Sequence, residues 1–344
     1  MKSKRVIGKC FGKTLGRLLI GLVVTGLTSW GMGALYYYGP GNGLLRFLAV
    51  MAFGLAVPCA FLWLPKRRRT LVGFLLVLAL LTAWWNTITP SHDRDWQPEV
   101  AVLPYATVDG NRVTLHNIRN FEYRSDTDFT PRYYDKTFDL AQLETADLLS
   151  SYWMGEAIAH LFVSFGFAGQ DYVAISIETR KERSEDFSSI RGFFKQYELI
   201  YVVADERDVI RLRTTHRQSQ EDVYLYRTRL APARAQRLFM DYIRQINALA
   251  AQPEFYNTLT TNCTTNILFH TQAAGGKARY NWKVLFSGYV PAYAYEIGRL
   301  DTSLPFVELR QRSRINERAQ AAHAAPDFSQ QIRMGLPKPA TLPD

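Results

Sequence analysis

The sequence has 344 residues, of which 47% are hydrophobic, so it is longer than one ordinary domain, and its formal net charge is +10. Residues 1–92 contain eleven Lys and Arg and no Asp or Glu, which leaves a net charge of −1 for residues 93–344. A nucleic-acid-binding protein would carry positive charge on its folded domain, whereas here the charge flanks apolar segments. The composition therefore excludes a typical nucleic-acid binder and favours a membrane as partner.

Three apolar stretches within residues 1–90 are long enough to cross a bilayer, which takes roughly 20 residues. They run over residues 18–38, 44–64 and 71–88. A cleaved signal peptide would be one segment with a small-residue cleavage site. Three successive segments predict a permanent three-helix transmembrane anchor; the alternative is three buried helices of a soluble protein.

Basic residues predict the orientation of this anchor. Six of them lie in the first 17 residues, and Lys66-Arg67-Arg68-Arg69 lies between the second and third segments. Both clusters can face the cytoplasm, as the positive-inside rule requires. We therefore expect a multi-pass protein with a cytoplasmic N-terminus and an extracytoplasmic C-terminal domain.

The remaining chain reads as a linker over residues 91–100, an α+β domain over 101–310 and a mobile tail over 311–344. We expect a helix over 140–153 after a loop over 127–139, and a mostly antiparallel sheet. The predicted strands cover 159–165, 172–178, 198–203, 209–212 and 223–226, and further helices cover 232–251 and 263–272.

Cys263 is the candidate nucleophile. Cys10 lies in the N-terminal tail and Cys59 in the second apolar segment, so Cys263 is the one cysteine of the exported domain, where cysteines usually pair. Thr261 and Asn262 are good N-cap residues, which places Cys263 in the first helical turn, beside Thr264. There, free N–H groups and the helix dipole stabilise a thiolate. The alternative is a small buried hydrophobe, as free cysteines often are.

A cysteine nucleophile needs a base. His270 lies seven residues along the same helix, about 10.5 Å away, and cannot reach Cys263. His160 instead stands in an apolar strand, where it needs a partner. A hairpin symmetric about Gly169 would put Glu178 opposite His160, so that the carboxylate orients the imidazole. The alternative for His160 is a core histidine satisfied by hydrogen bonds.

Arg180, which follows Glu178 closely, belongs either to a solvated turn or to a site for an anionic lipid head group. The chain has no HExxH or CxxC metal motif, no GxSxG nucleophile elbow and no phosphate-binding Walker loop. We therefore expect neither a metal nor a cofactor.

The chain resembles a bacterial family whose best-known member is the lipoprotein N-acyltransferase Lnb. The similar segments, in chain order, are HNIRNFEYRSDTDF (116–129), AHLFVSFGF (159–167), ISIETRKE (175–182), YELIYVVADERDVIRLRT (197–214), VYLYR (223–227), YNTLTTNCTTN (256–266) and GYVPAY (288–293).

The resemblance implies a circularly permuted papain-like, NlpC-type fold in which the histidine precedes the cysteine. His160 and Cys263 match that order, and Glu178 fits the polar third position. It also implies an inner-membrane enzyme with a periplasmic domain. Its cysteine would accept an acyl chain, as a thioester, from the diacylglyceryl group on the N-terminal cysteine of a lipoprotein. It would then pass the chain to the α-amine of that cysteine, which gives a lyso-form N-acylated lipoprotein.

One feature departs from the family: here the membrane segments precede the domain, whereas in Lnb-type proteins they generally follow it. Three functions therefore remain open. The first is acyl transfer on lipoproteins or lipids. The second is a papain-like amidase or peptidase that acts on cell-wall peptides. The third is a non-catalytic, membrane-anchored binding domain.

Overall fold

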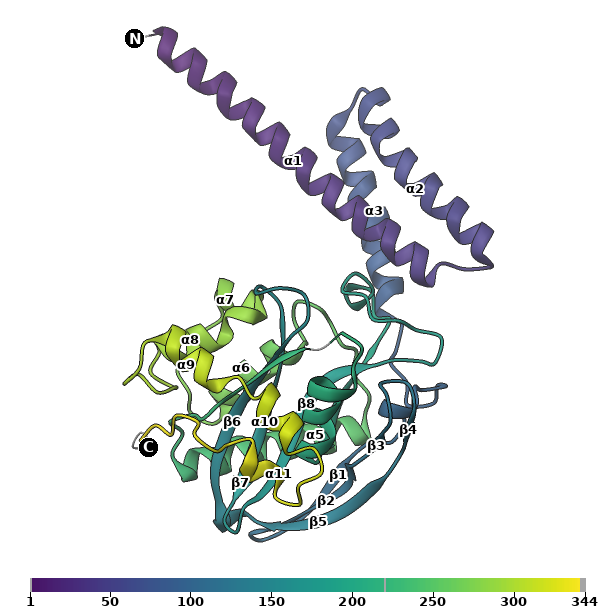
Figure 1. Ribbon diagram of the computed structural model, residues 1–344. Coiled ribbons are helices and arrows are strands. Elements are labelled where there is room, and N and C mark those ends of the chain that lie inside the picture. The colour runs from purple at the N-terminus through teal and green to yellow at the C-terminus, as the bar shows by residue number, and fades with distance from the viewer. Residues whose placement is uncertain (1, 220, 341–344) are drawn as a thin grey trace. The chain divides into compact units, whose positions relative to one another are not determined.

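The computed structural model describes residues 2–219 and 221–340, with side chains from residue 14 onward, so the side chain of Cys10 lies outside the described part. The chain divides into two compact units, residues 1–89 and 90–344 (Figure 1).

The first unit consists of three helices, α1 (Lys2–Tyr38), α2 (Gly43–Trp63) and α3 (Arg67–Asn86). Each contains a stretch that is long and apolar enough to cross a membrane: Thr14–Tyr38, Gly43–Trp63 and Arg67–Asn86. The three predicted segments are thus helical and apolar. Asn42 caps α2 by accepting a hydrogen bond from the backbone N–H of Leu45.

The second unit is built on one sheet in the order β1-β2-β9-β8-β7-β6-β10, with β5 also paired to β2. The β2–β9 pairing is parallel and the other pairings of this sheet are antiparallel, so the sheet is mixed. The strands are β1 (Tyr105–Asp109), β2 (Arg112–Arg119), β5 (Tyr133–Asp139), β6 (Leu143–Tyr152), β7 (Ala159–Phe167), β8 (Asp171–Arg180), β9 (Glu198–Ala204) and β10 (Asp222–Tyr226), and a separate hairpin joins β3 (Glu122–Tyr123) to β4 (Phe129–Thr130).

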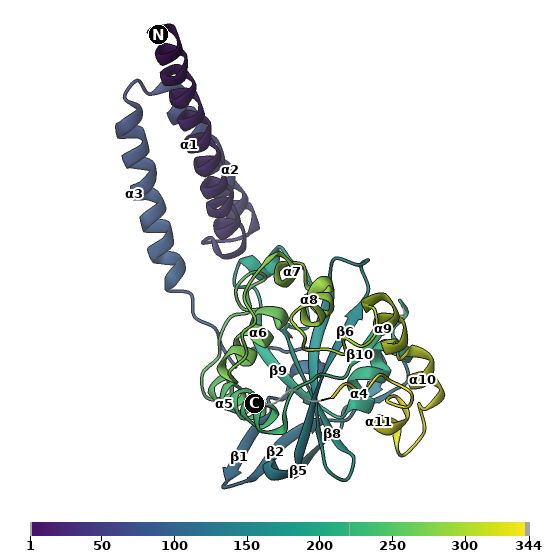
Figure 2. The ribbon, with the colours of Figure 1, turned by 90° about the vertical axis from the view of Figure 1, so that its left-hand side faces the viewer.

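Helices cover both faces of this sheet (Figures 1 and 2). The long amphipathic helix α5 (Pro232–Ala251) and α6 (Cys263–Ala273) pack on one apolar face. On the opposite face lie α4 (Glu206–Arg211), α10 (Asn316–Ala321) and α11 (Phe328–Gln331). The unit also contains α7 (Trp282–Leu285), α8 (Val290–Glu296), α9 (Phe306–Ser313), the π-helical turn η4 (Leu212–His216) and the 3-10 turns η1 (Pro98–Val100), η2 (Leu140–Gln142), η3 (Arg191–Phe193) and η5 (Ser287–Tyr289). The architecture is α+β, as predicted.

Three local predictions are wrong. The segment 140–153, predicted as a helix, forms η2 and the strand β6, which lies between β7 and β10 and is buried along almost its whole length. Burial on both faces removes the alternation that identifies a strand. The predicted loop 127–139 contains β4 and β5, and the predicted strand 209–212 belongs to α4 and η4.

Residues 91–100, expected to be a linker, instead pack on the domain. Trp96 is 6% exposed and donates a hydrogen bond to the carbonyl of His92, and the N–H of Ser91 donates to the carboxylate of Glu198. The expected mobile tail is also folded as far as residue 340, because Ile315, Phe328 and Ile332 are buried in the core below α4. Its last residues, 341–344, lie outside the described part.

Candidate active site

Cys263 is the first residue of α6, and the local sequence explains why the helix begins there. The side chain of Asn262 accepts a hydrogen bond from the N–H of Thr265 at 2.9 Å, and the Thr265 hydroxyl accepts one from the N–H of Asn262 at 3.0 Å. This reciprocal capping box satisfies two N–H groups that a helix start leaves without partners. The predicted helix start agrees with this geometry.

Three hydrogen-bond donors lie close to the Sγ atom of Cys263. The Thr264 hydroxyl lies 3.7 Å from Sγ, and the N–H groups of Thr264 and Leu161 also interact with it. Burial raises the pKa of the thiol, although these three donors act in the opposite direction. The expected preference for a thiolate at the helix start is therefore outweighed by burial. The resting group is a neutral, partly accessible thiol.

The β7–β8 hairpin supplies a histidine and a carboxylate. Its register pairs Phe162 with Ser176 and Phe167 with Asp171, which is symmetric about Gly169 as predicted. Continued by two residues, this register sets His160 opposite Glu178, and Nε2 of His160 lies 3.6 Å from Oε1 of Glu178. The two side chains thus share one face at the end of the hairpin.

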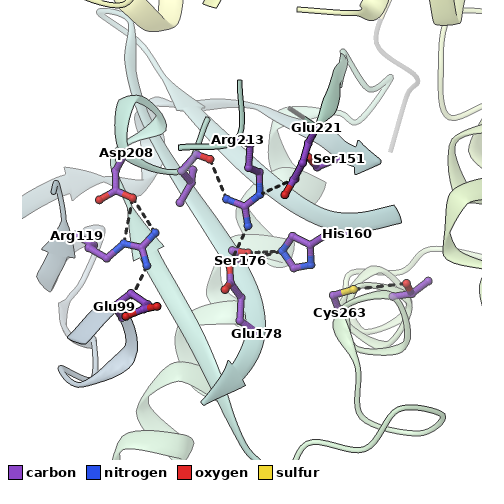
Figure 3. Close-up of polar contacts among 12 residues, drawn as sticks. Glu99, Arg119, Ser151, His160, Ser176, Glu178, Asp208, Arg213, Glu221 and Cys263 are labelled. Carbon is purple, nitrogen blue, oxygen red and sulfur yellow. Dashed lines mark hydrogen bonds and ion pairs between the residues drawn. The ribbon is translucent and has the colours of Figure 1, made fainter. Parts of the chain in front are cut away.

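Ser176 bridges the imidazole of His160 and the carboxylate of Glu178, and both of its contacts are shorter than the direct contact between them. The Ser176 hydroxyl lies 2.7 Å from Nε2 of His160 and donates to Oε1 of Glu178 at 2.7 Å (Figure 3). A carboxylate can only accept, so the single proton of the hydroxyl is used toward Glu178. The serine oxygen must then accept a hydrogen bond from Nε2–H of His160. This arrangement selects the tautomer whose Nδ1 is unprotonated.

Arg213 keeps the carboxylate of this relay charged. Its Nη2 atom donates to Oε1 of Glu178 at 3.1 Å, and its guanidinium is nearly fully buried. Burial opposes the charge of Glu178, but the charges of Arg213 and Arg119 and the hydrogen bond from Ser176 hold the pKa of Glu178 well below its usual range. The carboxylate is therefore ionised at every physiological pH.

The imidazole itself is neutral. Burial lowers the pKa of His160 to about 3, reinforced by the positive charges of Arg213 and Arg217 and opposed by Glu178. Figure 3 shows Nδ1 on the side of the ring toward Cys263, away from Ser176. The N–H of Leu161 contacts Sγ, so the thiol lies against β7 one residue beyond His160. No hydrogen bond links thiol and imidazole in the described part of the chain. The geometry presents a free base nitrogen on the side of a protonated thiol.

The residues that complete this site were not identified from the sequence. Ser176 was detectable, since it precedes Glu178 by two residues in a strand and therefore shares its face. Arg213 is 35 residues from Glu178 and gave no local signal. It is held in η4 by a hydrogen bond to the carbonyl of Val209 at 2.8 Å, and by Glu221, whose carboxylate also binds Ser151.

Arg180 does not belong to this site, nor to a solvated turn. It is 3% exposed and donates to the carbonyls of Val100 and Ala101 at 2.9 and 2.8 Å, while its guanidinium lies over the ring of Trp96. Such a buried side chain cannot reach a lipid head group. It fastens residues 96–101 to the sheet.

His270 is rightly excluded as partner of Cys263. It is buried, with Nδ1 at 2.7 Å from Asp241 and Nε2 at 2.6 Å from the Tyr201 hydroxyl. Both ring nitrogens are thereby occupied inside the core. Among residues 2–219 and 221–340, no three His, Cys, Asp or Glu side chains form a group that could hold a metal ion.

Comparison with known proteins adds a family. Residues 129–293 match the family described as the Lnb N-terminal periplasmic domain, a range that includes His160, Ser176, Glu178 and Cys263. No curated protein and no solved structure matches the chain. Together with the three apolar helices, the match indicates a membrane protein with a periplasmic domain, whose function relates to lipoproteins. The resemblance read from the sequence is thus confirmed for residues 129–293, which match the family of Lnb N-terminal periplasmic domains.

Proposed function

We propose that this protein is a membrane-anchored cysteine acyltransferase that takes an acyl group from a lipoprotein or phospholipid ester and transfers it to an amine. The observation that carries the proposal is the pairing of a thiol at a helix start, Cys263, with the relay His160–Ser176–Glu178. A nucleophile, a base and a group that orients the base are the parts that acyl transfer requires.

In the first step, Nδ1 of His160 takes the proton from Cys263 as Sγ attacks the carbonyl carbon of the ester. Charge develops on the carbonyl oxygen, and the N–H groups of Thr264 and Leu161, which act on the Cys263 thiol, are the candidate donors to it. The C–O bond of the ester then breaks, and the leaving alkoxide takes the proton from the imidazolium. The products are a thioester on Cys263 and a lyso-ester with a free hydroxyl.

In the second step, an amine attacks the thioester. His160 accepts the proton that the amine loses, and the C–S bond breaks to leave an amide and the thiolate, which is reprotonated. The imidazolium exists only during these steps, when Glu178 stabilises it through Ser176. Glu178 thus opposes the burial and the arginine charges that lower the resting pKa of His160.

We also propose a circularly permuted papain-like fold and a periplasmic location for the domain. His160 precedes Cys263 in the chain, the order expected of a circularly permuted papain-like domain. The basic clusters within residues 2–17 and at residues 66–69 favour a cytoplasmic N-terminus and a cytoplasmic α2–α3 turn in a bacterium. The catalytic domain then lies on the periplasmic side of the inner membrane, where lipid-linked esters are available.

The proposal is tested by mass spectrometry of lipoprotein N-termini in cells that carry the wild-type gene, Cys263→Ala or Cys59→Ala. Cys59 is a matched control because it is a free cysteine in the membrane unit, outside the proposed site. We expect N-acylated lipoproteins with wild type and Cys59→Ala, and their loss with Cys263→Ala. Identical N-termini in all strains, or a change in cell-wall peptide fragments instead, would contradict acyl transfer.

A further inference from the structure

An apolar cavity begins beside the proposed nucleophile. Its volume is about 130 Å³, and most of its surface is apolar. It lies between α6, α8 and the β6–β7 region of the sheet. The two helices also lie near one another in both views (Figures 1 and 2). Its lining includes Leu148 and Val163 from the strands, Ile267 from α6 and Ala294 from α8.

The cavity follows α6 away from the thiol. The lining residues from α6 are Thr264, Ile267, Leu268 and Thr271. Their spacing places them on one face of the helix. Seven residues of helix span about 10 Å. Thr264 lines the cavity and also lies beside the thiol, because its hydroxyl is 3.7 Å from Sγ of Cys263. The cavity therefore starts at the site of acylation and continues along the helix.

The chemistry of the lining identifies the part of the substrate that fits. The Thr271 hydroxyl is already used, since it donates to the carbonyl of Ile267 at 2.7 Å. A peptide would bury N–H and C=O groups against a wall with few partners for them, which is costly. A hydrocarbon chain has no such groups, and each CH₂ that it buries stabilises the complex by about 0.8 kcal/mol.

The charge of the lining disfavours binding of the amine acceptor inside this cavity. The carboxylate of Asp147 is neutralised by Arg227 and Arg333, at 3.0 Å each. Arg234 and Arg299 also line the cavity, and neither guanidinium has an ion pair with any residue in the described ranges. A net positive wall repels an ammonium group, so the acceptor has to approach the thioester from another side.

We propose that this cavity holds the acyl chain of the ester donor and of the thioester, with the reacting carbon at Cys263 and the hydrocarbon between α6 and the sheet. This inference rests on the proposed function and specifies where the acyl chain of the donor ester lies. The length of the cavity then sets which acyl chains are transferred.

The test compares two donors with the same head group, one palmitoyl and one octanoyl ester, on the full-length protein in nanodiscs. Ala294→Phe places a ring in the cavity, whereas Ala292→Phe adds the same ring to the same helix outside the lining. We expect Ala294→Phe to lower the acylation rate with palmitoyl ester by about tenfold or more, relative to octanoyl ester. Ala292→Phe should leave this ratio unchanged.

An equal rate for both chain lengths in Ala294→Phe, with thermal stability retained, would overturn the assignment of the cavity. If that variant does not fold, Ala278→Phe in the loop after α6 narrows the same cavity and replaces it. A binding measurement separates this inference from the proposed function, because a photoreactive palmitoyl ester can label Cys263→Ala without any thiol chemistry. Labels within residues 263–299 support the cavity even if no thioester forms, and labels confined to residues 14–86 contradict it.

Discussion

The Ser176 hydroxyl lies 2.7 Å from Nε2 of His160 and passes its own proton toward Glu178, whose carboxylate is 3.6 Å from the same nitrogen. The carboxylate therefore acts on the imidazole through the serine more than by direct contact. Since a hydroxyl has a single proton, this arrangement leaves Nδ1 as the ring nitrogen without a proton.

Ser176→Ala tests this relay. Without the hydroxyl, Nε2 of His160 loses its acceptor, and the ring can take the wrong tautomer. We expect the acylation rate of Cys263 to fall by about 10²-fold or more, a typical effect of removing a positioned acid–base contribution. Glu178→Gln should have a similar effect, measured as single-turnover acylation with a chromogenic ester.

The two substitutions should not be additive, because they interrupt one pathway. The double variant Ser176→Ala/Glu178→Gln is expected to be about as slow as the slower single variant. An unchanged rate in Ser176→Ala would show that the direct contact suffices. Multiplicative losses would show that the two residues act separately.

The pH dependence of thiol reactivity follows from the two pKa shifts. The pKa of His160 is lowered to about 3, so the imidazole is neutral above that pH, and burial raises the pKa of Cys263. Alkylation by iodoacetamide should therefore rise about tenfold per pH unit from pH 7 to 9, with Cys10 and Cys59 replaced by Ala. A plateau of fast alkylation below pH 7 would indicate a thiolate–imidazolium pair instead.

Arg213→Met should destabilise the domain. The substitution leaves the Glu178 carboxylate without its buried guanidinium partner, which costs about 3–5 kcal/mol in the free energy of unfolding. Arg183→Met is the matched control, because the Arg183–Asp95 pair is exposed and contributes at most about 1 kcal/mol. Chemical denaturation measures both.

Adding Glu178→Gln to Arg213→Met removes the uncompensated charge, so the double variant should recover part of the lost stability. Equal stability of Arg213→Met and wild type would mean that Glu178 does not depend on this partner.

His270→Gln separates the two buried histidines. His270 binds Asp241 and Tyr201 in the core, so its loss leaves buried polar groups without partners and costs about 1–3 kcal/mol. The acylation rate of the folded fraction should be unchanged, whereas His160→Gln should abolish acylation with a smaller effect on melting temperature. The reverse pattern would make His270 the base.

The orientation of the anchor is tested with single cysteines in a chain whose Cys10, Cys59 and Cys263 are replaced by Ala. Asn42→Cys lies in the α1–α2 turn and Pro65→Cys in the α2–α3 turn. A membrane-impermeant maleimide that reaches the periplasm should label Asn42→Cys in intact cells and Pro65→Cys only after lysis. The opposite labelling would invert the topology.

Much of this architecture was predictable from local patterns. The three apolar helices, α5 and α6 each carry their signal within one segment, and the β7–β8 register follows from the symmetric turn at Gly169. β6 was mistaken for a helix because its neighbours bury both of its faces, which no local period records. The folded end of the chain was missed because small residues such as Ala319 and Ala322 suffice to pack there.

The chemistry of the site was predictable only in part. The residue types and chain order pointed to Cys263, His160 and Glu178, but the neutral state of the thiol comes from burial, which depends on the whole fold. Arg213 reaches Glu178 from a separate π-helical turn, and Arg180 turned inward to hold residues 96–101. Contacts of this kind join segments that are distant in the sequence, so no local residue spacing predicts them.

The most direct test of the account is the intact mass of the full-length protein after incubation with a palmitoyl ester donor and no amine acceptor. We expect one added acyl group, located on the peptide that contains Cys263, removed by neutral hydroxylamine and absent from Cys263→Ala. Cys59→Ala should acquire the group as wild type does. An adduct that persists in Cys263→Ala, or no adduct with a donor from which lipoproteins are N-acylated in the same membranes, would contradict Cys263 as the nucleophile.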